Sequence, residues 1–238
     1  MTTRRVRSIA VVAMLSAGLQ LGGCVSPGPA TRFYLLTPAT GSPPSQQIKP
    51  IDRAAKSVTV VVKDVRLPMY LDRPQIVTRD AGNRLEFSEI EQWGGHLRED
   101  LARVLVINLG RVMEGDRVVA APYNPSVPPD YRVEVDILGF ERQPGGRVAL
   151  SAQWSVTRGA DGKPHAGAEG SFSGEPLPDS VSYDGLVSSM SRVYGELAQA
   201  IARSIRLGGG LAHEVVYLPF RAGRPCCRRT GGRRPGPD

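Results

Sequence analysis

The clearest pattern along the chain is the recurrence of apolar residues every three or four positions, which predicts two amphipathic helices. The first covers residues 88–109, with Ser88 and Glu91 fitting a capping box at its start and Gly110 placed to end it. The second covers residues 183–206. The apolar positions are Ile90, Trp93, Leu97, Leu101, Val104 and Leu105 in the first helix, and Leu186, Met190, Val193, Leu197, Ile201 and Ile205 in the second.

Alternation of apolar and polar residues predicts strands elsewhere. Residues 131–137 and 147–157 alternate on either side of Pro144-Gly-Gly146, so we expect a half-buried antiparallel pair, with 168–174 as a candidate third strand. The remaining segments expected to be extended are a short buried strand at 32–36, a valine-rich strand buried on both faces at 58–65, a hairpin formed by 75–79 and 84–87, and a strand at 117–120.

These elements predict a single α+β domain over residues 31–206. Its mixed, mostly antiparallel sheet packs against the two main helices, because one apolar face of a sheet has to be buried against another layer. Residues 67–74, with a proline at each end of the segment, read as irregular.

The N-terminus has the pattern of an export signal. A basic start, Met1 to Arg7, precedes an uncharged apolar run from Ile9 to Leu21, which is shorter than the ~20 residues of a membrane-spanning helix. Leu21, Gly22, Gly23 and Cys24 then resemble a bacterial lipobox, so we expect a signal peptide at 1–23, lipid on Cys24 and a tether at 24–30. The alternatives are an ordinary signal peptide with an incidental cysteine and an uncleaved anchor helix.

Lipid on Cys24 predicts stable membrane attachment, since two or more acyl chains are sufficient for it. Val25 and Ser26 follow the cysteine, where enteric bacteria use Asp to retain lipoproteins in the inner membrane. The absence of this Asp favours the outer membrane, with the domain facing the periplasm.

The formal net charge of +7 does not indicate nucleic-acid binding. Three arginines lie in the signal, and residues 207–238 contain six arginines against Glu214 and Asp238, so 7 − 3 − 4 leaves zero for the region between. The tail 207–238 is basic and is predicted to be disordered. It also holds Cys226 and Cys227, so the core is expected to contain neither a disulfide nor a thiolate metal site.

The chain offers little catalytic chemistry. The three histidines, His96, His165 and His213, are not at metal-binding spacing, and no phosphate-binding loop, nucleophile elbow or zinc-protease motif is present. We therefore expect no enzyme activity, no metal and no cofactor.

One segment indicates the function more specifically than composition does: Leu67-Pro-Met-Tyr-Leu-Asp-Arg-Pro-Gln-Ile-Val77. It resembles the signature stretch of the paraquat-inducible protein C (PqiC) family, the auxiliary lipoproteins of MCE-type ABC transport systems. Arg32-Phe-Tyr-Leu-Leu36 is similar to the family's early strand, and Trp93-Gly-Gly-His-Leu97 to its first helix. The similarity continues in order to Arg206.

This resemblance implies a non-catalytic component of a lipid transport system. It would work with a periplasmic MCE-domain protein, its permease and its ABC components, docking that assembly at the outer membrane and supporting membrane integrity. A ring-forming partner also suits a homo-oligomer. Two other functions stay open: a pilotin-like envelope assembly factor, and a lipid-anchored hydrolase that joins His96 or His165 to a Ser and an Asp.

Within the signature segment, Tyr70, Asp72, Arg73 and Gln75 are hypothesised to bind a partner protein. The alternative is that Asp72 or Arg73 braces the loop inside the fold. Pro68 and Pro74 restrict the backbone in either case.

Overall fold

The computed structural model describes residues 28–39, 57–122 and 128–208. The signal sequence, Cys24 and the tail beyond Gly208 lie outside these residues, so the predictions made for them are not addressed by the fold. The strands are β1 (Arg32–Tyr34), β2 (Thr59–Arg66), β3 (Gln75–Arg79), β4 (Leu85–Trp93), β5 (Arg117–Ala120), β6 (Tyr131–Arg142), β7 (Val148–Arg158) and β8 (Pro164–Ser173). The helices are α2 (Leu97–Val112) and α3 (Tyr183–Leu207).

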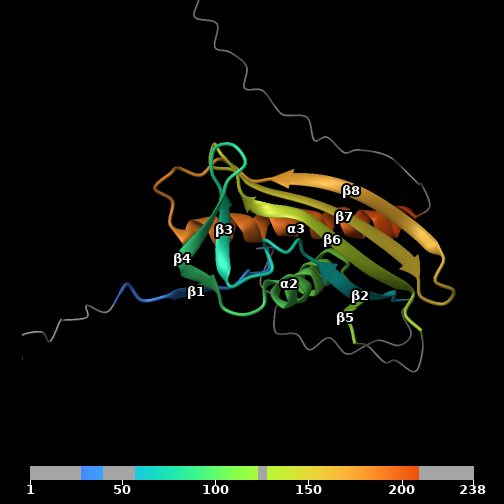
Figure 1. Cartoon of the computed structure of the whole chain (residues 1–238). Coiled ribbons are helices and arrows are strands. Elements are labelled where there is room, and N and C mark those ends of the chain that lie inside the picture. The colour runs from blue at the N-terminus through green and yellow to red at the C-terminus, as the bar shows by residue number, and fades with distance from the viewer. Residues whose placement is uncertain (1–27, 40–56, 123–127, 209–238) are drawn as a thin grey trace, which may run out of the picture.

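The strands form one mixed sheet, as predicted (Figure 1). The order runs β1-β4-β3-β6-β2-β5, and β7 and β8 continue from the other edge of β6. The β3–β4, β6–β7 and β7–β8 pairs are antiparallel, whereas β1–β4, β2–β5, β2–β6 and β3–β6 are parallel. The long strand β6 therefore joins the two halves of the sheet, since it pairs with β2 near its start and with β3 at its end.

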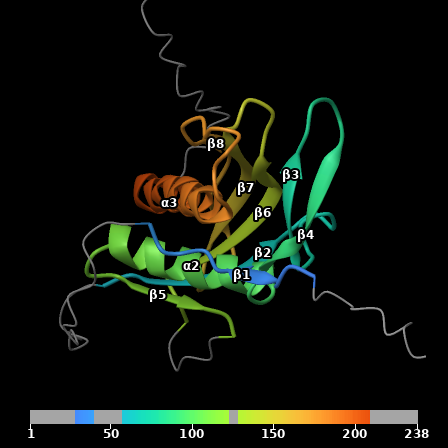
Figure 2. The same ribbon diagram turned by 90° about the vertical axis from the view of Figure 1, so that its left-hand side faces the viewer.

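Both helices cover the same face of the sheet (Figure 2). Helix α3 packs on β6, β7 and β8, helix α2 packs on β2 and β5, and the helices contact each other. At the centre, the rings of Phe140 and Tyr194 are 5.9 Å apart, and the Tyr194 hydroxyl donates to the carbonyl of Leu101 over 3.1 Å. This buried layer confirms the α+β domain with two main helices.

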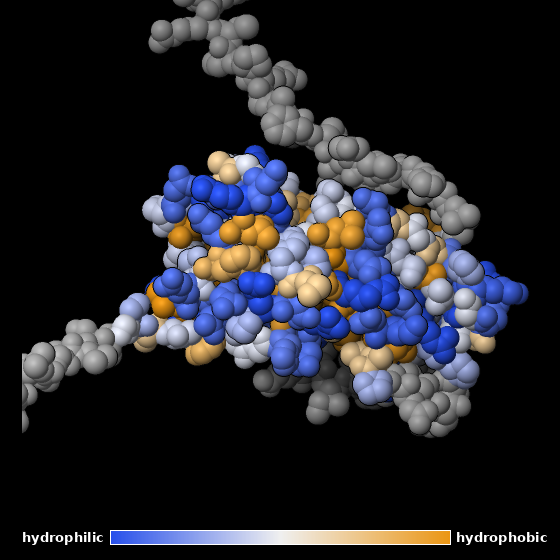
Figure 3. All heavy atoms as spheres, viewed as in Figure 1, coloured by the Kyte–Doolittle hydropathy of each residue, from blue (hydrophilic) through white to orange (hydrophobic). Residues whose placement is uncertain are grey.

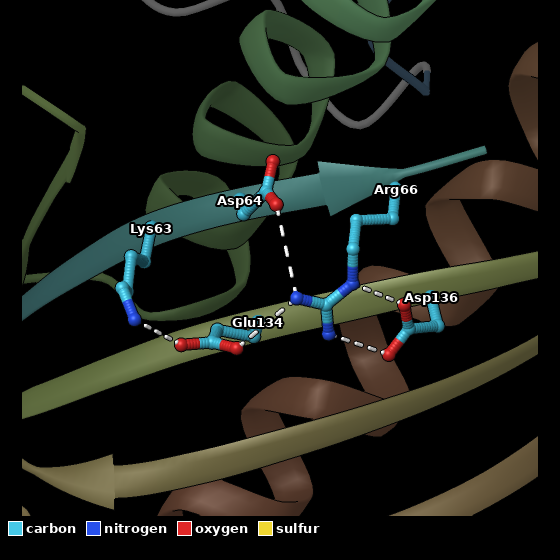
Figure 4. A network of polar contacts seen from close by, with 5 residues as sticks. All are labelled: Lys63, Asp64, Arg66, Glu134 and Asp136. Atoms are coloured by element: carbon cyan, nitrogen blue, oxygen red, sulfur yellow. Dashed lines mark hydrogen bonds and ion pairs between the residues drawn. The ribbon is translucent and has the colours of Figure 1, made fainter.

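The opposite face of the sheet carries paired charges (Figure 4). Lys63 on β2 pairs with Glu134 on β6, and Arg66 forms a bidentate pair with Asp136. The alternation in the first half of β6 accounts for this arrangement: Val133 and Val135 point towards the helices, while Glu134 and Asp136 point outwards. The valines of β2 are buried as predicted, but Lys63 and Arg66 keep one side of this strand in solvent.

The prediction that residues 88–109 form one helix is wrong at its start. Residues 85–93 are strand β4, and the helix begins at Leu97 after the N-cap His96. β4 lies between β1 and β3, so its backbone groups bond to two neighbouring strands. Ser88 does accept a hydrogen bond from the Glu91 amide over 3.0 Å, but within a strand. Gly110 lies inside the helix, which continues to Val112.

The first strand also differs from its prediction. Only Arg32–Tyr34 form β1, and it is an edge strand rather than a buried one. Phe33 and Leu35 are 66% and 53% exposed, whereas Leu36 is buried. The remaining predicted strands are confirmed. β6 and β8 are longer than the pattern indicated, and β7 is shifted by one residue.

The segment after β1 is held between the two helices. Its backbone amides donate to helix side chains: Leu36 to Asp100 over 2.7 Å, Thr37 to Ser191 over 3.0 Å and Ala39 to Asn108 over 3.0 Å. These contacts anchor the point at which the chain enters the domain, because the buried amides find acceptors there without belonging to a sheet.

Candidate partner-binding site

The candidate site is built on the loop that joins β2 to β3, residues 67–74. The loop is irregular but ordered by its own backbone: the Leu71 amide donates to the carbonyl of Pro68 over 3.0 Å, and the Arg73 amide to that of Leu71 over 2.9 Å. Leu71 is buried, and Met69 is 90% exposed. The two prolines and the buried side chain of Leu71 give the loop a defined shape.

Tyr70 points into the fold. Its hydroxyl donates to Oε2 of Glu141 over 2.9 Å, and burial, followed by the nearby charge of Glu141, raises the pKa of Tyr70 to about 12. Glu141 is buried and also accepts from Arg79, from Gln143 and from the amide of Phe140. The side chain of Tyr70 therefore braces the loop against β6 and offers a partner little polar surface.

Asp72 and Arg73 are placed differently. Asp72 is exposed and pairs with Arg98 of α2 over 3.0 Å. The Arg73 guanidinium lies 4.2 Å from the centre of the Phe87 ring, a cation–π contact with an apolar side chain that is 41% exposed. Its Nε is buried and makes no hydrogen bond within the described residues. Asp72 and Arg73 thus each contact another residue of the fold, and each keeps part of its side chain accessible to a partner protein.

Gln75 opens β3 opposite Gln92 of β4 and is half-buried. Beside it, a surface hollow of about 420 Å³ separates the loop from the start of α2. The hollow is lined by Phe33, Asp72, Arg73, Pro74, Gln92, Trp93, Gly94, Gly95, His96 and Leu97. The structure thus brings Asp72 and Arg73 to one hollow, while Tyr70 is turned away from solvent.

Several contributors to this surface were missed from the sequence. Phe33 joins the hollow because β1 pairs in parallel with the C-terminal half of β4, a long-range pairing that no local pattern reveals. Arg32 forms a bidentate pair with buried Glu91, which locks that pairing. Once residues 32–36 are taken as extended, the alternation of side chains between the two sides of a strand places Phe33 and Leu35 together on one side.

The structure describes two of the three histidines, His96 and His165. His96 is the exposed N-cap residue of α2. His165 lies 3.0 Å from the carbonyl of Ile205, and its ring is 4.5 Å from that of Tyr131. Within residues 28–39, 57–122 and 128–208, no group of three or more His, Cys, Asp or Glu side chains is arranged to hold a metal ion. In the same part of the chain, no helix combines the length and apolar character needed to cross a membrane.

Comparison with solved structures supports the fold. A crystal structure of an uncharacterised protein is 20% identical with a TM-score of 0.57, covering 74% of this chain and 99% of the other. A crystal structure from Xanthomonas campestris is 14% identical with a TM-score of 0.56, covering 72% of this chain and 93% of the other. At these identities the similarity concerns the fold alone.

Comparison with curated proteins gives no match. A family model does match: residues 34–202 fit the family described as ABC-type transport auxiliary lipoprotein component. The matched range runs from the end of β1 to the last turns of α3 and so includes the candidate loop, the hollow and both helices. Because this match covers well over half of the chain, the protein belongs to the family of ABC-type transport auxiliary lipoproteins.

Proposed function

We propose that this protein is the non-catalytic, lipid-anchored component of an MCE-type ABC system that moves lipid between the two membranes of a bacterial envelope. The observation that carries the proposal is the family match over residues 34–202, preceded by the lipobox-like sequence Leu21 to Cys24. After cleavage behind Gly23, lipid on Cys24 holds the domain on the outer membrane, facing the periplasm. An auxiliary role calls for docking rather than turnover, in keeping with the absence of catalytic motifs from the sequence.

The partner in this proposal is a periplasmic MCE-domain protein, which brings its permease and ABC components with it. The docking surface consists of Asp72 and Arg73, which line the hollow, and of Gln75 at the start of β3, with Tyr70 supporting the loop from inside. Three features of the loop support this choice: the exposed carboxylate of Asp72, the half-buried guanidinium of Arg73, and Met69, which is almost fully exposed. Arginine and methionine are both enriched in protein interfaces. Ring symmetry in the partner favours a homo-oligomer of this lipoprotein.

The test is a pull-down of the full-length, lipidated protein from native envelopes, read by mass spectrometry. We expect recovery of an MCE-domain protein with its permease, and loss of that recovery in the Asp72→Ala/Arg73→Ala variant. The matched control is Asp161→Ala/Lys163→Ala, which removes another exposed ion pair in the turn between β7 and β8, at the opposite end of the molecule (Figure 1).

Each alternative outcome has a distinct meaning. Recovery of a secretin in place of the transport proteins would support the assembly-factor function. Normal recovery of the MCE-domain protein by a folded Asp72→Ala/Arg73→Ala variant would contradict the docking surface but leave the transport function standing.

A further inference from the structure

Phe33 and Leu35 are unusual among the apolar side chains of the described residues, because both are exposed on one short stretch of chain. Extended backbone sends alternate side chains to opposite sides. Tyr34 and Leu36 therefore turn inwards, with the Tyr34 ring 6.2 Å from that of Tyr183, while Phe33 and Leu35 share the outer side. We call this pair the β1 apolar patch.

The β1 apolar patch lies beside two glycines, Gly94 and Gly95. A Cβ placed on Gly94 would lie 3.4 Å from Cδ2 of Leu35, so Leu35 covers a glycine. Phe33 lines the hollow that also contains Gly94 and Gly95. The glycines carry no side chains that could cover Phe33 and Leu35, which remain 66% and 53% exposed. Figure 3 shows hydrophobic atoms on the surface at this end of the domain.

The patch is also the part of the domain closest along the chain to the predicted lipid. Cys24 precedes Phe33 by 33 − 24 = 9 residues. A fully extended chain spans at most about 3.6 Å per residue, so Phe33 cannot be farther than about 32 Å from the lipidated cysteine. Covalent attachment at this distance keeps the patch at a high effective concentration near the bilayer surface.

We propose that the β1 apolar patch contacts the lipid bilayer to which Cys24 is anchored, which fixes the orientation of the domain on the membrane. The inference rests on the proposed lipidation of Cys24 but not on the transport partner. An aromatic and an aliphatic side chain can enter the headgroup region and add a second attachment to the acyl chains. Asp72 and Arg73 line the same hollow as Phe33, so this contact sets the docking surface at a constant height above the membrane.

The test uses the full-length, lipidated protein in vesicles of phosphatidylethanolamine and phosphatidylglycerol, with Cys226 and Cys227 changed to Ser. An environment-sensitive dye is placed on Thr31→Cys, an exposed position beside the patch, and in a second preparation on Gln153→Cys of β7, an exposed position away from it. We expect lipid-borne nitroxide to quench the dye at position 31 and aqueous iodide to be excluded from it, with the opposite behaviour at position 153.

The decisive variant is Phe33→Ser/Leu35→Ser, in which the dye at position 31 should lose its nitroxide quenching and become accessible to iodide. Phe33→Leu, which keeps an apolar side chain, should behave as the parent. Equal iodide access in the parent and the serine variant would overturn the proposal, as would shielding that appears only after envelope proteins are added. The intact mass of the protein separately reports lipid on Cys24, so a failure of anchoring is distinguishable from a failure of patch contact.

Discussion

The hydroxyl of Tyr70 donates a hydrogen bond of 2.9 Å to Oε2 of Glu141, a residue that is 2% exposed. This single contact connects the candidate docking loop to the longest strand of the sheet. Arg79 and Gln143 donate to Oε1 of the same carboxylate, and the Phe140 amide donates to Oε2, so both oxygens have partners. The buried oxygens of this carboxylate therefore all have hydrogen-bond donors, as buried polar groups in folded proteins generally do.

Removal of the Glu141 charge is expected to destabilise the protein. Glu141→Gln leaves the mostly buried Arg79 without its counter-ion, and we expect a loss of about 2–3 kcal/mol in the free energy of unfolding. Tyr70→Phe removes one donor and should cost about 1–2 kcal/mol. Urea unfolding followed by circular dichroism measures both. Equal stability of Glu141→Gln and the parent would show that the cluster does not brace the loop.

The same contact predicts a loss of stability at alkaline pH. The pKa of Tyr70 rises from its ordinary 10.0 to about 12, mainly through burial. A raised folded-state pKa contributes stability that is fully present below the unfolded pKa and disappears as pH rises through the folded pKa. We therefore expect unfolding midpoints to fall between pH 10 and about 12. In Tyr70→Phe this decline should be smaller, and an unchanged decline would assign it to other tyrosines.

The charge network on the outer face of the sheet should matter at acidic pH (Figure 4). Hydrogen bonds from Lys63 and Arg66 lower the pKa values of Glu134 and Asp136 below their ordinary 4.5 and 3.8. Depressed values contribute stability above the unfolded pKa that is lost as pH falls through the folded one. For Arg66→Met we expect a loss of about 0.5–1 kcal/mol at neutral pH, since the pair is exposed.

That loss should shrink as the solution is acidified, and urea unfolding at neutral pH and at about pH 3 measures the change. Asp136→Asn provides the second arm of a double-mutant cycle. Additive effects of Arg66→Met and Asp136→Asn would show that the two charges do not interact.

Two helix glycines should respond oppositely to alanine. A Cβ on Gly195 of α3 would lie 2.5 Å from Cβ of Ala39, in the segment held between the helices, whereas a Cβ on Gly110 of α2 has open space. Gly110→Ala should stabilise the protein by up to about 1 kcal/mol, because alanine is the better helix former. Gly195→Ala forces Ala39 to move and should destabilise the protein despite the same gain. Thermal unfolding of the two variants provides the comparison, and stabilisation of both would contradict the close packing of Ala39.

Much of this protein follows from its sequence. The amphipathic period of residues 183–206 predicts helix α3, and strict alternation predicts the β6–β7 hairpin, because each of these patterns repeats over enough residues to exclude the other structure. The same reasoning predicts the α+β class. The signature at residues 67–77 resembles the family to which the chain belongs, and it identifies the loop with the exposed Asp72 and Met69.

Tertiary structure decided the remainder, because the deciding partners are distant in the chain. Residues 88–93 have an apolar spacing compatible with a helix, yet they form a strand, since β1 and β3 supply hydrogen bonds on both sides. The hydroxyl of Tyr70 donates to Glu141, which lies 71 positions away in the chain, so its role as a brace of the loop depends on a distant residue. The exposure of Phe33 and Leu35 likewise depends on how their segment packs beside β4. Local sequence specifies which residues are apolar or polar, but long-range pairing decides which of them meet solvent.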